Sequence, residues 1–69
     1  MLSGAEIYKL RSKTGMSVRK FAKRTGLSTS TIYRIEMEKV HRLHKSTVYI
    51  LAEALGVPVE VILGDDIDA

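Results

Sequence analysis

Cysteine and tryptophan are absent from this chain of 69 residues, and proline and phenylalanine occur once each. The lack of cysteine excludes disulfides, a thiolate zinc site and a cysteine nucleophile. No apolar run approaches the ~20 residues of a membrane-spanning helix, and residues 1–6 show no charged leader before an apolar stretch. We therefore expect an intracellular, cytoplasmic protein with no membrane partner, whose stability comes from packing.

Aromatic residues are also scarce, with three Tyr and one Phe scattered along the chain. Such scattering offers no stacking surface of the kind that single-stranded RNA requires. Ser, His and Asp are present, but no pattern resembles a nucleophile elbow, a phosphate-cradling loop or an oriented base. We expect no enzymatic activity and no cofactor. His41 and His44 have neither a cysteine nor a carboxylate between them, so we expect no metal site.

The composition is that of one small folded domain. Hydrophobic residues make up 45% of the chain, which excludes a disordered protein. A chain of this length buries only ~60% of the surface that its unfolded form exposes, so its core must be compact. There is no linker, repeat or low-complexity tract. We expect residues 1–64 to form the domain and residues 65–69 a short acidic tail.

Charges are divided unevenly along the sequence. Residues 1–45 hold all 11 Lys and Arg but only three acidic residues, a balance of +8. Residues 46–69 hold five acidic residues and no basic one, a balance of −5. A polyanion attracts the first part and repels the second, which favours a nucleic-acid partner. The alternative is a solvated surface whose charge is merely uneven.

Residues 17–36 have the spacing of two short helices joined by a tight turn. Ala22 leaves room for close helix approach, and Gly26 can adopt the left-handed turn conformation that bulkier residues avoid. Ile32 and Ile35 lie on the inward stripe of the second helix. At these four positions the chain resembles the repressor/Cro-like, XRE-type helix-turn-helix family of bacterial and phage transcriptional regulators, and the likeness runs from about residue 7 to residue 63.

The pattern and the resemblance together predict an all-α protein, a compact five-helix bundle resembling the lambda repressor DNA-binding domain, with the helix-turn-helix formed by the second and third helices. Ser3, Ser17 and Ser28 should cap the first three helices, and the third, at about 28–37, is the expected recognition helix. A fourth helix should run from about 45 to 55. Segment 57–63 is ambiguous because its valines alternate as in a strand. The resemblance implies a short fifth helix there, which is our choice.

The third helix should carry the residues that read DNA bases. A helix advances about 100° per residue, so the inward isoleucines turn four side chains outward, and the resemblance adds Ser28 at the position that meets the groove first. In the major groove, Arg can make a bidentate contact to guanine. The alternative is that these are ordinary surface and capping residues. The candidates for base readout are Ser28, Thr29, Ser30, Tyr33 and Arg34.

Basic side chains near the motif are candidates for phosphate contact. The family often has a Gln at the start of the second helix, where this chain has Val18, so Ser17 or the main-chain N–H groups would take over that contact. Arg19 and Lys23 share one face of the second helix and are our candidates there. The other basic pair, at positions 20 and 24, shares another face, so we expect at most one pair to face DNA. In the loop that follows the third helix, which departs from the family's Glu-x-Gly turn, we add Lys39 and Arg42.

The resemblance implies two further contacts. Arg11 of the first helix should reach Glu36 at the end of the third, as a structural ion pair. The chain should form a homodimer around the fifth helix, through Val61 and Glu60, and bind a palindromic double-stranded DNA operator. The alternative function is a protein-binding adaptor or antitoxin on the same fold. An apolar exposed face on the third helix would favour that alternative.

Overall fold

The computed structural model describes residues 1–39 and 43–64, and within these ranges every regular element is a helix. Segment 57–63 therefore contains the expected short helix, which begins at residue 59, and the all-α bundle is confirmed. No helix in these ranges is both long enough and apolar enough to span a membrane. The helices are α1 (Gly4–Thr14), α2 (Val18–Thr25), α3 (Thr29–Glu36), α4 (Lys45–Leu55) and α5 (Val59–Leu63).

Local capping determines where the first three helices begin. The Ser3 hydroxyl accepts a hydrogen bond from the main-chain nitrogen of Glu6 at 3.2 Å, and the Glu6 carboxylate accepts one in return from the Ser3 nitrogen, which completes a capping box. Ser17 and Ser28 cap α2 and α3 in the same way through their hydroxyls. Each cap satisfies a main-chain donor that the first helical turn leaves without a partner.

Tertiary packing explains why α5 is a helix. Ile62 is fully buried, whereas Val61 is 42% exposed, so the alternating valines do not mark a buried face. The Ile62 carbonyl accepts a hydrogen bond from the Leu2 nitrogen at 2.8 Å, which ties α5 to the start of the chain. Pro58 occupies the N-cap position and not the first helical turn. Long-range contacts of this kind override a weak local strand preference.

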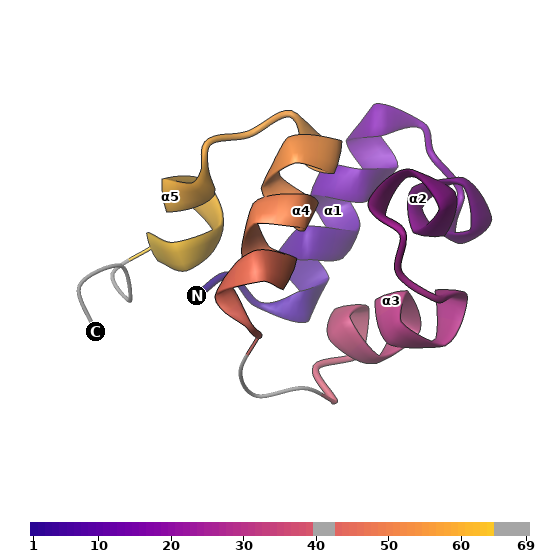
Figure 1. Cartoon of the computed structure of the whole chain (residues 1–69), viewed down its shortest axis with the longest axis horizontal. Coiled ribbons are helices and arrows are strands. Elements are labelled where there is room, and N and C mark those ends of the chain that lie inside the picture. Colours follow the sequence, from indigo (N-terminus) through magenta and orange to yellow (C-terminus); the bar gives the residue numbers. More distant parts are fainter. Residues whose placement is uncertain (40–42, 65–69) are drawn as a thin grey trace.

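The hydrophobic core joins all five helices and holds α3 at one end of the molecule. In Figure 1, α1 and α4 lie side by side in the centre, with α2 and α3 beyond one side of this pair and α5 beyond the other. Met16 and Leu27 are half-buried and pack at the edge of the core. The largest fully buried side chains are Phe21, Ile7, Ile32, Leu51, Ile62 and Val48.

Candidate nucleic-acid interface

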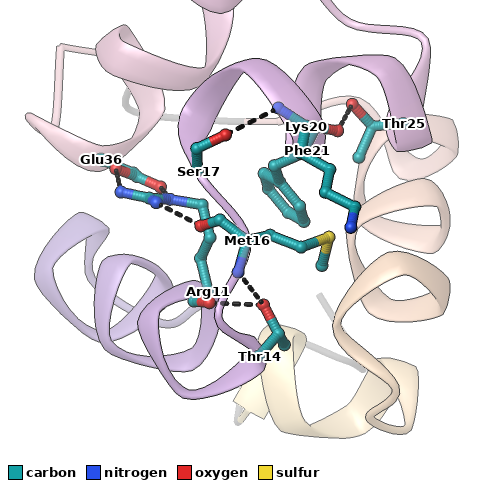
Figure 2. A network of polar contacts seen from close by, with 8 residues as sticks. All are labelled: Arg11, Thr14, Met16, Ser17, Lys20, Phe21, Thr25 and Glu36. Atoms are coloured by element: carbon teal, nitrogen blue, oxygen red, sulfur yellow. Dashed lines mark hydrogen bonds and ion pairs between the residues drawn. The ribbon is translucent and has the colours of Figure 1, made fainter.

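The turn between α2 and α3 is fixed by Thr25 and Gly26. Thr25 is buried, and its hydroxyl donates to the carbonyl of Phe21 at 2.9 Å and accepts from the nitrogen of Leu27 at 3.2 Å (Figure 2 shows the first of these bonds). Gly26 follows with φ +78°, in the left-handed region that glycine adopts without strain. The sequence pattern predicted the glycine but not the threonine, whose hydroxyl holds both sides of the turn.

Ser28 begins α3 with its hydroxyl already committed to the protein. Its oxygen accepts from the Thr31 nitrogen at 3.1 Å and lies 2.9 Å from the Thr31 hydroxyl. The residue is exposed, so it lies at the surface that α3 presents. Any contact of Ser28 with DNA must share a hydroxyl that is also needed for capping.

The outward face of α3 combines hydroxyl, aromatic and cationic side chains. Ile32 and Ile35 are buried, and all five candidates for base readout are exposed. Because a helix turns about 100° per residue, the direction opposite the two isoleucines is that of Ser30, flanked by Tyr33 and Arg34. The Arg34 side chain makes no hydrogen bond or ion pair within residues 1–39 and 43–64. Its guanidinium is therefore available to a ligand.

Met37 is a member of this face that the sequence analysis missed. It is the C-cap residue of α3, and its nitrogen donates to the Tyr33 carbonyl at 2.8 Å, so its Cα continues the helical path. The side chain is 67% exposed, the largest value among the large hydrophobic residues described. Its spacing of seven from Ser30 and three from Arg34 is the signal that could have found it.

The end of α3 is anchored to α1 by Arg11, which the structure brings together with Glu36. The Arg11 Nε donates to Glu36 Oε2 at 2.6 Å and Nη2 donates to Oε1 at 3.0 Å, a bidentate pair with both side chains over 90% buried. Arg11 Nη1 also donates to the carbonyl of Met16 at 2.8 Å. Figure 2 shows the guanidinium between these two acceptors. One side chain thus joins α1, the α1–α2 turn and α3.

Electrostatics around Arg11 keep this group charged. The hydrogen bond to Glu36 raises the pKa of Arg11, and this effect outweighs burial, which acts in the opposite direction. The ring of Tyr8 lies 5.1 Å from the guanidinium carbon, within the range of a cation–π contact. The buried cation therefore has a carboxylate on one side and an aromatic ring on another.

A second contact between α1 and α3 lies at the turn that follows α3. The family's turn has a glycine there, whereas this chain has Glu38. Gly4 is buried, and a Cβ atom there would lie 2.4 Å from the carbonyl oxygen of Ile35, so only glycine fits. Glu38 adopts φ +59°, an uncommon conformation for this residue type. Its carboxylate accepts from the Gly4 nitrogen at 3.3 Å, at the start of α1. The chain therefore makes the turn without glycine.

The basic residues of α2 divide into two faces. Lys20 and Arg24 line a surface hollow together with Glu53 of α4, so this pair lies on the α4 side of α2. Arg19 and Lys23, both exposed, lie on the side of the helix that turns away from α4. This arrangement leaves Arg19 and Lys23 as the pair that can face a ligand beside α3.

The remaining candidates that the structure describes lie just beyond α3 and on α5. Lys39 is exposed, and its nitrogen donates to the Arg34 carbonyl at 2.8 Å, which places it just beyond α3. Arg42, and with it His41, lies outside the described residues. Glu60 is exposed, and Val61 borders a hollow whose other walls come from Leu2 and α1. In residues 1–39 and 43–64, no three His, Cys, Asp or Glu residues gather as a metal site would require.

Comparisons with known proteins agree with this geometry. A sequence model of the family described as Helix-turn-helix matches residues 7–62. One chain of a solved complex of the SinR and SinI proteins has the same fold, with a TM-score of 0.84 and 21% identity over 97% of the present chain. The present chain spans 65% of the length of that neighbour. A comparison with curated proteins finds no match.

Proposed function

The chain belongs to the XRE-type helix-turn-helix family of DNA-binding transcriptional regulators, and we propose that it is a repressor that binds a specific double-stranded DNA sequence. In this proposal α3 enters the major groove, where each base pair presents a distinct set of donors, acceptors and methyl groups. Residues 1–64 act as the DNA-binding domain in this proposal, and the segment 65–69, expected as an acidic tail, lies outside the described residues.

The observation that carries the proposal is the mixed, unpaired face of α3 on a rigid support. Ser30 and Arg34 are exposed beside each other, and within the described ranges neither side chain has a protein partner. The Arg11–Glu36 pair and the buried isoleucines fix the helix from behind. A helix held in this way can present a guanidinium to base edges with little loss of conformational freedom on binding.

The proposed contacts follow from where the side chains lie. Residues on the outward face of α3 read bases, and polar or basic residues around it contact phosphates, which sets the register on the duplex. Ser28 contacts the groove only through the hydrogen-bonding capacity of its hydroxyl that the cap on Thr31 does not use. The base set is Ser28, Thr29, Ser30, Tyr33 and Arg34, and the phosphate set is Ser17, Arg19, Lys23, Lys39 and Arg42.

The proposed functional unit is a homodimer on a palindromic operator. A single recognition helix covers a few base pairs, whereas two-fold dimers place two such helices about 34 Å apart, one turn of DNA. Val61, an exposed apolar residue, and its neighbour Glu60 supply the dimer contact on α5. Repression needs nothing beyond this binding, because a protein seated on a promoter blocks the polymerase.

Selection from random duplex DNA at one stated salt concentration tests the function. We expect a palindromic consensus with its half-sites one helical turn apart, bound more tightly than the starting pool. The Arg34→Ala protein, run in parallel, should select a less defined consensus. Recovery of no consensus by the wild-type protein would reject sequence-specific DNA binding.

A second candidate function is supported by one observation. Tyr33 and Met37 are 56% and 67% exposed on the face of α3, so part of this face is apolar. Such a surface is also suited to a protein partner, and the solved neighbour is itself in a complex of two proteins. An adaptor or antitoxin of this kind would retain its partner after Arg34→Ala and lose it after Tyr33→Ala.

A further inference from the structure

The exposed thioether at the end of α3 has no role in the contacts assigned above. Met37 is 67% exposed, and it belongs neither to the core nor to the residues packed against it. Exposing a flexible apolar side chain gives the folded monomer no stability. Its position on the same face as the proposed base-reading residues points to a ligand contact instead.

The direction of Met37 follows from the hydrogen bonding of the helix end. Because its nitrogen makes the helical bond to the Tyr33 carbonyl, its Cα lies on the path of α3. Seven residues correspond to nearly two turns of about 3.6 residues each, so Met37 points the same way as Ser30, from the opposite end of the helix. Arg34 lies one turn before Met37 and on nearly the same face.

The main chain beyond Met37 is held in place by three hydrogen bonds, two to α3 and one to the start of α1. The Glu38 nitrogen donates to the Ile35 carbonyl at 3.1 Å, and the Lys39 nitrogen donates to the Arg34 carbonyl at 2.8 Å. The Glu38 carboxylate accepts from the Gly4 nitrogen of α1. These contacts fix where the Met37 side chain leaves the surface, so it is pre-positioned for a contact and does not sit on a loose end.

We propose that Met37 reads thymine by contact of its thioether chain with the 5-methyl group in the major groove. This inference rests on the proposed function. The thymine methyl is the one apolar group that base pairs display in that groove, and apolar side chains are its matching partners. Arg34 is suited to contact guanine, and the Met37 side chain lies beside it. The proposal therefore predicts a half-site in which a thymine lies close to a guanine.

The surroundings of Met37 favour DNA over a protein as the occupant of this face. Lys39 follows it at the surface, and Ser30 and Arg34 share its face, so the apolar patch is small and mixed with polar and cationic groups. The buried centre of a protein–protein interface typically has fewer charged residues and more apolar residues than this face. A protein partner is therefore an outcome of the test and not the proposal.

The experiment replaces each thymine of the selected operator with uracil, which removes the methyl group and keeps every hydrogen-bonding group. Affinities are measured for the wild-type, Met37→Ala and Met37→Leu proteins. For the wild type, we expect one thymine in each half-site at which uracil weakens binding about fourfold, which corresponds to ~0.8 kcal/mol for one buried methyl-sized group. Met37→Ala should bind the thymine and uracil duplexes equally, and Met37→Leu should keep most of the difference.

Melting of each variant is the control, and Met37→Ala should melt within a few degrees of wild type because the side chain is exposed. A uracil penalty that persists in Met37→Ala, or the absence of any methyl-sensitive thymine, would overturn the role of Met37 and leave sequence-specific binding intact. If the Met37→Ala protein sediments at a different mass from the wild type, the thymine contact is overturned and Met37 contributes to a protein contact instead. Failure to select any operator would reject the proposed function itself.

Discussion

Arg11 illustrates how one side chain determines the angle between helices. Burying a charged pair costs desolvation, so the net stabilisation from Arg11 and Glu36 together is small. Removing one partner is different, because the other charge then stays buried without compensation. Since the pKa of Arg11 is raised by Glu36, the cation persists through the neutral range, and stability that depends on its charge is lost only as the pH rises into the strongly basic range.

Replacing Glu36 with alanine should therefore destabilise the fold far more than other carboxylate changes. We expect a loss of about 3 to 5 kcal/mol, the range found when one partner of a buried pair is removed. Glu53→Ala is the matched control, because Glu53 is exposed and surface changes stay within about 0.5 kcal/mol. Urea or thermal unfolding measures both. Equal melting of the two variants would contradict a structural role for the pair.

Arg34 should act on sequence preference and leave folding unchanged. Its guanidinium is exposed and has no partner in residues 1–39 and 43–64, so Arg34→Ala should melt like the wild type. A bidentate contact to guanine is worth about 1 to 3 kcal/mol of discrimination, so preference should relax at one or two operator positions. Competition binding with single-base variants of the operator measures this. Unchanged discrimination at every position would exclude Arg34 from base readout.

At the scale of helices, the sequence predicted most features that depend on neighbouring residues, although not the role of the Thr25 hydroxyl. The serines that cap α1, α2 and α3, and the glycine of the turn at Gly26, act within four residues and can be recognised directly in the sequence. The helix in segment 57–63 was predicted only from the family resemblance, because its valine pattern is also that of a strand. The burial of Ile62 that decides the matter is a long-range contact.

Contacts between distant segments explain several features that the sequence did not predict. Gly4 is needed because the start of α1 packs on the carbonyls at the end of α3, and nothing in its local sequence indicates this. The positive φ of Glu38 and its bond to Gly4 depend on the same approach. The sequence indicated two basic pairs on α2 but not which of them faces α4, since that depends on how the two helices pack against each other.

The division of α2 into two faces leads to a test with a control on the same helix. Lys23→Ala should weaken binding to all duplex sequences alike and reduce the slope of log affinity against log salt by roughly one, as expected for one lost phosphate contact. Lys20→Ala removes the same charge from the side that faces α4 and should change the slope less. Fluorescence titrations at several salt concentrations measure both. Equal slopes for the two variants would argue that these lysines act only through net charge.

At the scale of the whole molecule, the proposed DNA and dimer surfaces lie apart. Figure 1 places α2 and α3 on one side of the central α1–α4 pair and α5 on the other. A second copy bound at α5 therefore leaves both recognition helices uncovered. The basic residues that surround α3 come from the first 45 positions of the chain, whereas α5 carries an acidic residue and no basic one.

Dimerisation through α5 should be sensitive to charge at Val61. This side chain is 42% exposed, so Val61→Asp should leave the monomer folded while placing two carboxylates face to face in a two-fold dimer. We expect the sedimenting mass to fall from dimer to monomer and operator affinity to fall with it. Ala5→Asp, an equal charge change at an exposed position of α1, should leave the mass unchanged. A wild-type protein that sediments as a monomer at the concentrations used for DNA binding would exclude this interface.

Seating of α3 in the major groove can be tested most directly by following the main-chain amide signals of ¹⁵N-labelled protein as the selected operator duplex is added. We expect the largest shifts from Thr29 to Met37, smaller ones at Arg19 and Lys23, and little change on the exposed face of α1 around Lys9. Large shifts confined to α4 or α5, with the signals of α3 unmoved in a saturated complex, would contradict the proposed recognition helix.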